Sequence, residues 1–280
     1  MRVLVTGATR GLGRAIVEAL AREGGNGHII YLGCRDPSAG QALARSLGGG
    51  IQPLQLDVAD AASVTAAAAS VSASGSQLDA LINNAGVLLE RDGVDLASIV
   101  EPTLLINMDG VRLVTEAFLP LLRDGGQVIN VSSGAGTRAA GTLSDARRAE
   151  LDEAVDSDRL RAMIARLAHE AAGQACQAGE TPIYGLSKMG LNYYTRLLAR
   201  QTSRVRVNAC SPGFCRTEIA GPGADYSRRE PKDAALGADV VIKLLGEELG
   251  ADATGRFYKE CSKPGTPLDK ARSAEERWVA

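Results

Sequence analysis

The chain reads Thr6-Gly7-Ala8-Thr9-Arg10-Gly11-Leu12-Gly13 directly after a short apolar run and directly before a helical pattern that continues to Glu23. Glycines at this spacing allow a tight turn and a close approach of the backbone to a ligand, and the N-terminus of a helix offers free N–H groups to a pyrophosphate. A glycine cluster alone also occurs in ordinary strand-to-helix turns. The flanking strand and helix are what make this stretch a predicted nucleotide-binding loop.

The rest of the chain continues the alternation of strand and helix. Such alternation is typical of βαβ units, so we expect an α/β protein of the Rossmann class: a doubly wound, mainly parallel sheet with helices on both faces. We interpret residues 1–280 as a single NAD(P)-binding domain. Strands are expected at residues 3–6, 29–34, 52–56, 80–83, 127–131, 204–209 and 254–258, and helices at 12–23, 39–47 and 61–74.

Composition indicates a protein that acts on small molecules. The chain is 45% hydrophobic and 23% charged, which suffices for one large core. A net charge of −2 gives no basic footprint for nucleic acid or an anionic membrane. No apolar run has the length of a membrane span, and the first strand pattern leaves no room for a signal peptide, which predicts a cytoplasmic protein. The cysteines lack a Cys-x-x-Cys spacing, so we expect neither a metal site nor a redox pair; they are Cys34, Cys176, Cys210, Cys215 and Cys261.

The end of the second predicted strand bears on the choice of cofactor. It reads Gly33-Cys34-Arg35-Asp36, at the point where this fold contacts the adenosine ribose. A guanidinium suits a ribose 2′-phosphate, so Arg35, together with Arg10 of the glycine loop, favours NADPH/NADP. Asp36 leaves NAD open as the alternative cofactor, and both arginines could instead be solvated loop residues.

A tyrosine and a lysine stand four residues apart in Tyr184-Gly185-Leu186-Ser187-Lys188. Residues at this spacing share one face of a helix. A free phenol titrates near pH ~10, and a neighbouring positive charge stabilises the phenolate, which brings the group toward a pKa useful for proton transfer. The pair alone also fits a surface phenol beside a lysine. Its position downstream of a dinucleotide loop makes it a catalytic candidate.

Further motifs follow in a fixed order. Asn83-Asn84-Ala85-Gly86 comes after a predicted strand, Asn107 lies in a helical stretch, Ser132-Ser133 closes another strand, and Pro212-Gly213 follows Val207-Asn208-Ala209. With the glycine loop and the Tyr-x-x-x-Lys pair, the chain resembles the short-chain dehydrogenase/reductase family over nearly its whole length.

The resemblance implies a catalytic set of Asn107, Ser133, Tyr184 and Lys188. It further implies that Asp57 contacts the adenine, that Asn83 and its neighbours line the cofactor cleft, and that Thr217 lies near the nicotinamide carboxamide. The full expected cofactor site also includes Tyr184, Lys188 and the residues Gly7, Thr9, Arg10, Gly11, Leu12, Gly13, Arg35, Asp57, Val58, Asn84, Ala85, Gly86, Pro212, Gly213 and Thr217.

These residue types suit the reduction of a carbonyl. Hydride arrival places negative charge on the carbonyl oxygen, so the site needs hydrogen-bond donors and one proton donor. We expect Tyr184 to donate the proton, Ser133 to position the oxygen, and Lys188 to lower the pKa of the phenol and, by resemblance, to hold the nicotinamide ribose. Asn107 cannot titrate and is expected to hold a water that links Lys188 to solvent. Taken singly, each residue is also compatible with a structural role.

The segment 139–180 is much longer than the corresponding connection in most of the family. Ser144 and Ser157 can serve as helix N-caps, and an apolar stripe recurs near the helical period at Leu151, Val155, Leu160, Ile164 and Leu167. A similar insertion marks the monomeric carbonyl reductases of this family, where it covers the helix faces that relatives use to associate, so we expect a monomer. A surface excursion or a wall of the substrate pocket is the alternative. His169 is interpreted as a structural or surface residue.

Together these features predict an NADPH-dependent enzyme that reduces small to medium ketones or aldehydes to alcohols. An alcohol or hydroxysteroid-type dehydrogenase and a 3-oxoacyl thioester reductase are alternatives on the same residues. Outside enzymes, an NAD(P)-sensing regulatory protein would explain the glycine loop but not the complete catalytic set. A scaffold that docks partners on the inserted helices would instead require a large exposed apolar patch. Beyond its small-molecule carbonyl substrate we expect no nucleic-acid or membrane partner and no metal.

Overall fold

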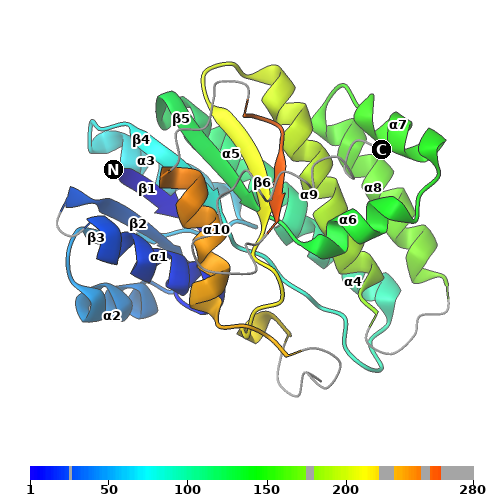
Figure 1. Cartoon of the computed structure of the whole chain (residues 1–280), viewed down its shortest axis with the longest axis horizontal. Coiled ribbons are helices and arrows are strands. Elements are labelled where there is room, and N and C mark those ends of the chain that lie inside the picture. Colours follow the sequence, from blue (N-terminus) through cyan, green and yellow to red (C-terminus); the bar gives the residue numbers. More distant parts are fainter. Residues whose placement is uncertain (25–26, 175–179, 221–229, 247–252, 260–280) are drawn as a thin grey trace.

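A seven-stranded parallel sheet forms the centre of the protein (Figure 1). The structure is a computed structural model that describes residues 1–24, 27–174, 180–220, 230–246 and 253–259. The strand order, β3-β2-β1-β4-β5-β6-β7, reverses between β1 and β4, and in such sheets the ligand cleft opens at the carboxyl ends of the strands beside this reversal. The strands are β1 Arg2–Val5, β2 Ile29–Cys34, β3 Ile51–Gln55, β4 Leu78–Asn83, β5 Leu122–Val131, β6 Arg206–Ser211 and β7 Phe257–Lys259. The predicted α/β class and parallel sheet are confirmed.

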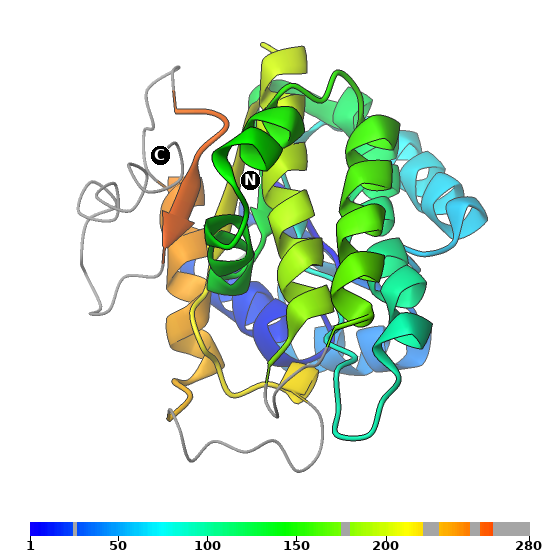
Figure 2. The ribbon, with the colours of Figure 1, turned by 90° about the vertical axis from the view of Figure 1, so that its right-hand side faces the viewer.

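Helices cover both faces of this sheet (Figures 1 and 2). Side chains alternate along each strand, so Val3 and Val5 pack with one layer of helices while Leu4 packs with the other. All three are fully buried, and burial of such a side chain contributes roughly 1.5–3 kcal/mol. One layer consists of α1 Gly11–Gly24, α2 Pro37–Leu47 and α10 Ala234–Gly246, and the other of α3 Ala61–Ala73, α4 Leu96–Leu104, α5 Gly110–Phe118 and α9 Pro182–Gln201.

The segment between β5 and α9 adds three helices, α6 Gly134–Gly141, α7 Asp145–Asp152 and α8 Ser157–Ala172. Helix α8 lies beside α9 and also contacts α4, as the view in Figure 2 shows. Four members of the predicted stripe are buried, whereas Val155 is 70% exposed because it falls between α7 and α8 rather than on a helix. The insertion therefore packs on the outer surface of the helices that carry the candidate catalytic residues.

The structure confirms the expected N-cap of α7 but not that of α8. The Ser144 hydroxyl accepts a hydrogen bond from the N–H of Arg147, as predicted. Ser157 is instead the first residue of α8, and the cap is Asp156, whose carboxylate accepts from the N–H of Arg159 at 2.7 Å. A carboxylate is an N-cap as good as a hydroxyl and adds a favourable charge at the helix N-terminus.

Other element boundaries differ from the sequence prediction most at the last three strands. Strand β5 begins at Leu122 rather than 127, β6 at Arg206 rather than 204, and β7 at Phe257 rather than 254. Before β7, side chains take part in the bonding to β6: the Thr254 hydroxyl accepts from the N–H of Val207, and the Asn208 amide donates to the carbonyl oxygen of Ala253 and accepts from the N–H of Arg256. Among the described residues, no helix combines the length and apolar character needed to cross a bilayer.

Candidate functional site

The glycine loop connects β1 to α1 and has the backbone that the sequence predicted. Gly7 and Gly11 have φ angles of +61° and +52°, a conformation that other residues rarely adopt. At Gly13 a Cβ atom would lie 2.3 Å from the carbonyl oxygen of Gly7 and 2.5 Å from Nδ2 of Asn84. The loop therefore has no room for a side chain at Gly13, and the N-terminus of α1 faces it directly. This is the geometry of a cradle for a pyrophosphate.

The segment after β4 holds the glycine loop in place. Nδ2 of Asn84 donates to the carbonyl oxygens of Thr6 and Gly7, at 2.9 and 3.1 Å, and the Thr6 hydroxyl accepts from the N–H groups of Asn84 and Ala85, each at 3.0 Å. Asn83 lies elsewhere. Its side chain is buried in the core, where Nδ2 donates to Thr115 and Asn130, so the expectation that Asn83 itself lines the cleft is wrong for its side chain.

The residues expected to read the ribose lie at the ends of β1 and β2. Arg10 and Arg35 are exposed, and their guanidinium groups form no hydrogen bond or ion pair with other described residues. Asp36, in contrast, is the N-cap of α2: its carboxylate accepts from the N–H and the hydroxyl of Ser38, at 2.8 and 2.7 Å, and these bonds lower its pKa. The carboxylate is thus committed to the helix rather than oriented freely toward a ribose.

The remaining expected cofactor residues lie around the same edge of the sheet. The Asp57 carboxylate accepts from the N–H of Ala59 at 3.0 Å, and Val58 packs where a Cβ on Gly110 would clash. Thr217 lies against the glycine loop, because a Cβ on Gly11 would be 3.2 Å from its Cβ. Thr9, Leu12, Gly86, Pro212 and Gly213 are half-buried at this edge, and Gly213 has a φ of +79°.

Tyr184 and Lys188 lie on the first turns of α9, and Ser133 follows β5 as the N-cap of α6. The Ser133 hydroxyl lies beside the phenol of Tyr184, close enough to act on its pKa. Nζ of Lys188 lies 5.9 Å from the centre of the Tyr184 ring and donates to the carbonyl oxygen of Val131 at 2.9 Å. A Cβ on Gly86 would be 3.4 Å from the same Nζ, so the ammonium also lies beside the segment after β4.

Burial dominates the titration of this pair. It raises the pKa of Tyr184, while the Ser133 hydroxyl acts to lower it, and the charges of Glu90 and Arg138 act in opposite directions. Burial also lowers the pKa of Lys188 to about 8. The expectation that Lys188 lowers the pKa of the phenol is therefore not met here: the phenol shifts upward, and Lys188 is not among the groups that shift it.

Asn107 lies in an irregular turn that the sequence did not predict. Residues Leu105–Asp109 form a π-helix between α4 and α5. Oδ1 of Asn107 accepts from the N–H of Val87 at 2.8 Å, and Nδ2 donates to Val87 O and to the Ser187 hydroxyl, both at 2.9 Å. Ser187 in turn donates to the carbonyl oxygen of Tyr184 at 2.8 Å. Asn107 thus joins the segment after β4 to α9, which carries the candidate pair Tyr184 and Lys188. The water that Asn107 is expected to hold between Lys188 and solvent stays a prediction.

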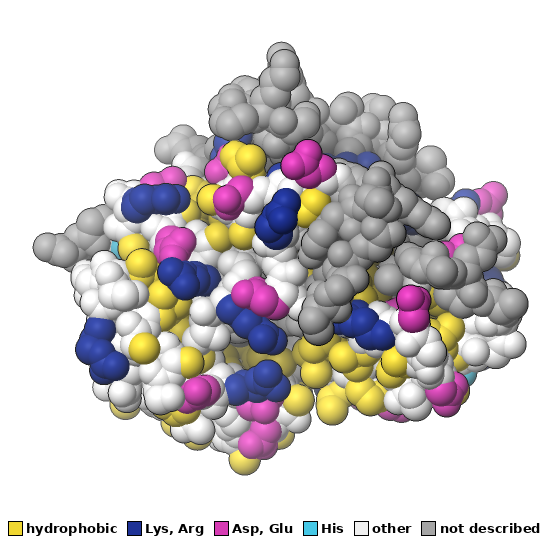
Figure 3. Space-filling view, turned by 90° about the horizontal axis from the view of Figure 1, so that it is seen from below, with side chains coloured by type: hydrophobic (Ala, Val, Ile, Leu, Met, Phe, Trp, Pro, Cys, Tyr) yellow, Lys and Arg dark blue, Asp and Glu magenta, His cyan; other side chains and the backbone are white. Residues whose placement is uncertain are grey.

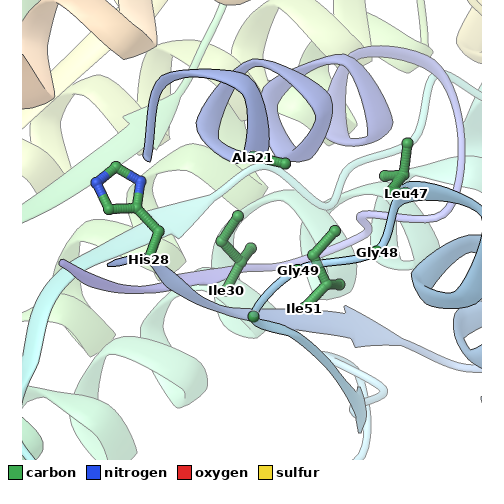
Figure 4. A pocket seen from close by; sticks show the side chains of 8 residues that line it. Ala21, His28, Ile30, Leu47, Gly48, Gly49 and Ile51 are labelled. Carbon is green, nitrogen blue, oxygen red and sulfur yellow. The ribbon is translucent and has the colours of Figure 1, made fainter. Parts of the chain in front are cut away.

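Another hollow in the molecule lies away from these residues. Ala21, His28 and the Gly48–Gly50 turn line it, together with Ile30, Leu47 and Ile51, at the amino ends of β2 and β3 (Figure 4). Because Tyr184 and the glycine loop belong to the opposite edge of the sheet, this hollow is separate from the candidate site.

On the face drawn in Figure 3, acidic and basic side chains are interspersed.

Within the described ranges, no three His, Cys, Asp or Glu side chains come together in a way that could hold a metal ion. Cys34 and Cys210 are buried, Cys215 is half-buried, and none of the three forms a disulfide within the described residues. Burial raises the pKa of Cys210 to about 12. Cys176 and Cys261 lie outside the described residues.

Two family profiles cover most of the chain. The short chain dehydrogenase profile matches residues 1–144, and a profile described as enoyl-(acyl carrier protein) reductase matches residues 161–248. Carbonyl reductase (NADPH) 1 of Oryctolagus cuniculus is 33% identical over 265 residues, which cover 90% of this chain and 92% of that protein. The Homo sapiens protein of the same name has the same identity and coverage.

The chain is a short-chain dehydrogenase/reductase. It is an oxidoreductase of this family, and its relatives include carbonyl reductases. Among solved structures, salutaridine reductase from Papaver somniferum superposes with a TM-score of 0.74 at 26% identity, over 93% of this chain and 99% of that one. The predicted family is confirmed.

Sequence reasoning missed two features of this short-chain dehydrogenase/reductase. One is the link through Ser187, which sits inside the Tyr-x-x-x-Lys motif and was not interpreted. The other is Glu90, whose carboxylate accepts from the N–H of Tyr184 at 2.6 Å. Glu90 follows Val87-Leu88-Leu89 but begins a charged run, so no local pattern marks it as buried. In the sequence 94 positions separate it from Tyr184, and only the fold brings the two together.

Proposed function

We propose that this protein is an NADPH-dependent carbonyl reductase that converts small to medium, partly apolar ketones or aldehydes to alcohols, with Tyr184 as the proton donor. One observation carries the proposal: the hydroxyl of Ser133, the phenol of Tyr184 and the ammonium of Lys188 come together at the edge of the sheet that also holds the glycine loop. A cytoplasmic location is part of the proposal.

The residues of the glycine loop fit a dinucleotide. Gly7 and Gly11 have positive φ angles, Gly13 excludes a side chain, and the N-terminus of α1 supplies free N–H groups for the phosphates. When bound, NADPH supplies the hydride that reduces the carbonyl carbon. Exposed Arg10 and Arg35 would hold the 2′-phosphate, and Asp36, committed to capping α2, would not compete for the ribose. The similarity to carbonyl reductases (NADPH) supports the same cofactor.

In this mechanism the chain's own side chains stabilise and protonate the substrate oxygen. As the carbonyl carbon is reduced, negative charge develops on its oxygen, and the hydroxyls of Ser133 and Tyr184 donate hydrogen bonds to it. Tyr184 then transfers its proton to that oxygen, which completes the alcohol. Its raised pKa keeps the phenol protonated at neutral pH, as a proton donor requires. Lys188, whose Nζ lies 5.9 Å from the centre of the ring, would hold the nicotinamide ribose, as the family resemblance implies.

The alternative functions would use the same residues for oxidation, for another substrate, or for cofactor binding alone. An alcohol or hydroxysteroid-type dehydrogenase would need the phenolate as a base, which the raised pKa of Tyr184 disfavours. A 3-oxoacyl thioester reductase would keep the same catalytic set and differ in its substrate. A regulatory protein that senses NAD(P) does not require the hydroxyls of Ser133 and Tyr184 to lie side by side.

The proposal is tested by NADPH consumption over a panel of ketones, quinones and aldehydes. Tyr184→Phe should lower kcat by ~100- to 10,000-fold, the usual contribution of general acid catalysis, while the affinity for NADPH stays nearly unchanged. Ser133→Ala should lower kcat as well. A Tyr184→Phe variant with wild-type turnover would exclude the phenol as proton donor, and binding of NADPH without turnover on any carbonyl would favour the sensing protein.

A further inference from the structure

Glu90 is a buried carboxylate next to the candidate proton donor. It lies in the loop between β4 and α4, and only 8% of its surface is exposed, whereas Asn84 to Leu89 before it are half-buried. A charged side chain is rarely buried to this extent without a partner. The role of such a residue is therefore defined by what it contacts.

The contact is the backbone of Tyr184. Helix α9 begins after Thr181, whose side chain makes no capping hydrogen bond, and its first residue, Pro182, has no N–H. Oε1 of Glu90 accepts from the N–H of Tyr184, the third residue of the helix, at 2.6 Å. A residue from another part of the chain thus supplies the cap that the helix itself lacks, and a carboxylate at a helix N-terminus is favourable.

The second oxygen of Glu90 adds an electrostatic effect. Oε2 is buried and has no hydrogen-bond partner among the described residues, so the N–H of Tyr184 is the one hydrogen-bond donor seen on this carboxylate, while Nη1 of Arg91 donates to the backbone carbonyl of Glu90. Ser133, the N-cap of α6, and Arg138 within α6 both act to lower the pKa of the phenol, and Lys188 lies beside the phenol on α9. Glu90 is the charged group that acts in the opposite direction and opposes formation of the phenolate.

We propose that Glu90 is a positioning residue of the reductase, which fixes the first turn of α9 and keeps the Tyr184 phenol protonated so that it donates rather than accepts a proton. The inference rests on the proposed function, since it assigns to Tyr184 the role of proton donor.

Two substitutions separate the two roles. Glu90→Gln keeps an amide oxygen that can accept from the N–H of Tyr184 but removes the negative charge, and Glu90→Ala removes both. Asp92→Asn is the matched control, because Asp92 is an exposed carboxylate two positions away in the same loop. Each variant is studied as the full chain, by the pH profile of kcat for reduction and for oxidation. The ionisation of Tyr184 is followed directly by NMR with tyrosine labelled with carbon-13 at Cζ, and Tyr184→Phe identifies the resonance.

With Glu90→Gln, the Tyr184 resonance should titrate at lower pH than in the wild type. The fall of kcat for reduction and the rise of kcat for oxidation that accompany ionisation of the phenol should both move to lower pH. Glu90→Ala should in addition lower kcat for reduction about 10-fold, with KM for NADPH unchanged. The idea is overturned if Glu90→Gln leaves the titration in place, or if Asp92→Asn shifts it equally. The NMR titration needs no turnover, so it tests the role of Glu90 even if no carbonyl is reduced. Absence of carbonyl reduction would count against the proposed function alone.

Discussion

At the scale of single residues, Arg35 and Asp36 show how neighbours in the sequence take different tasks. Asp36 closes the first turn of α2 through two bonds with Ser38, while Arg35 extends into solvent beside the glycine loop. From the sequence alone, both side chains were candidates to contact the ribose. The capping bonds decide between them. The sequence prediction begins this helix at residue 39, whereas α2 begins at Pro37, and the earlier start is what makes Asp36 the N-cap.

We therefore predict that Arg35→Ala narrows a preference for NADPH over NADH. A charge-assisted hydrogen bond is worth about 1.5–3 kcal/mol, so the ratio of kcat/KM values for the two cofactors should fall by roughly 10- to 100-fold. Asp36→Asn, which retains an acceptor for the N–H of Ser38, should leave the ratio unchanged. Equal use of both cofactors by the wild-type enzyme would contradict the assignment and return Asp36 as the residue that contacts the ribose.

Residues within motifs were the most predictable part of the site. The glycine loop, Ser133 and the Tyr184–Lys188 pair occupy the places expected of them because each depends on local backbone geometry: a turn, a strand end or one helical face. Asn107 and Glu90 depend on contacts between distant segments, and the sequence does not define these. The direction of the pKa shift of Tyr184 was missed for the same reason, since burial is a property of the packed molecule.

At the scale of elements, the inserted helix α8 is attached to the π-helix that carries Asn107. Nε of Arg161 donates to both carboxylate oxygens of Asp109, at 3.1 and 3.0 Å, and Nη2 donates to Glu101 at 2.7 Å. The Arg161 and Asp109 side chains are only 20% and 21% exposed, so this ion pair is screened less than a surface pair. Helix α8, the π-helix and α9 also pack closely. A Cβ on Gly190 of α9 would lie 2.5 Å from Sδ of Met108 in the π-helix and 3.0 Å from Ile164 of α8.

We predict that Arg161→Ala lowers the free energy of unfolding by about 1–3 kcal/mol, because Asp109 would lose its partner. The matched control is Arg166→Ala on the same helix, whose pair with Glu150 spans 3.7 Å and whose side chain is 58% exposed. An exposed pair of this kind contributes about 0–1 kcal/mol. Urea unfolding measures both variants, and an equal loss of stability in the two would show that the link between α8 and the π-helix is not special.

The insertion also shows what limits prediction at this scale. The period of Leu151, Leu160, Ile164 and Leu167 predicted helices with a buried face, and these residues are buried. Where that face would dock did not follow from the period, because any apolar surface can accept it. Val155 fits the same period but lies in the turn between two helices, so periodicity across a helix boundary is not a reliable guide to burial.

At the scale of the whole molecule, the position of α8 bears on assembly. Its buried face packs on α9 and α4, and Ile164 at the centre of that face is fully buried. By the family resemblance, the outer surfaces of these helices are where shorter relatives associate. A surface already covered within one chain is not free to bury area against a second copy, so we infer that the protein is a monomer.

Light scattering at micromolar concentration should accordingly report the mass of one chain, 29.1 kDa. Ile164→Glu would place a charge in the contact between α8 and α9, which should detach α8, expose apolar faces of α9 and α4, and cause association or aggregation. Val155→Glu is the control, since Val155 is 70% exposed and its substitution should leave the mass unchanged. A stable tetramer of the wild type would show that α8 does not prevent assembly, and a soluble, monomeric Ile164→Glu variant would show that the faces beneath α8 do not need to be covered.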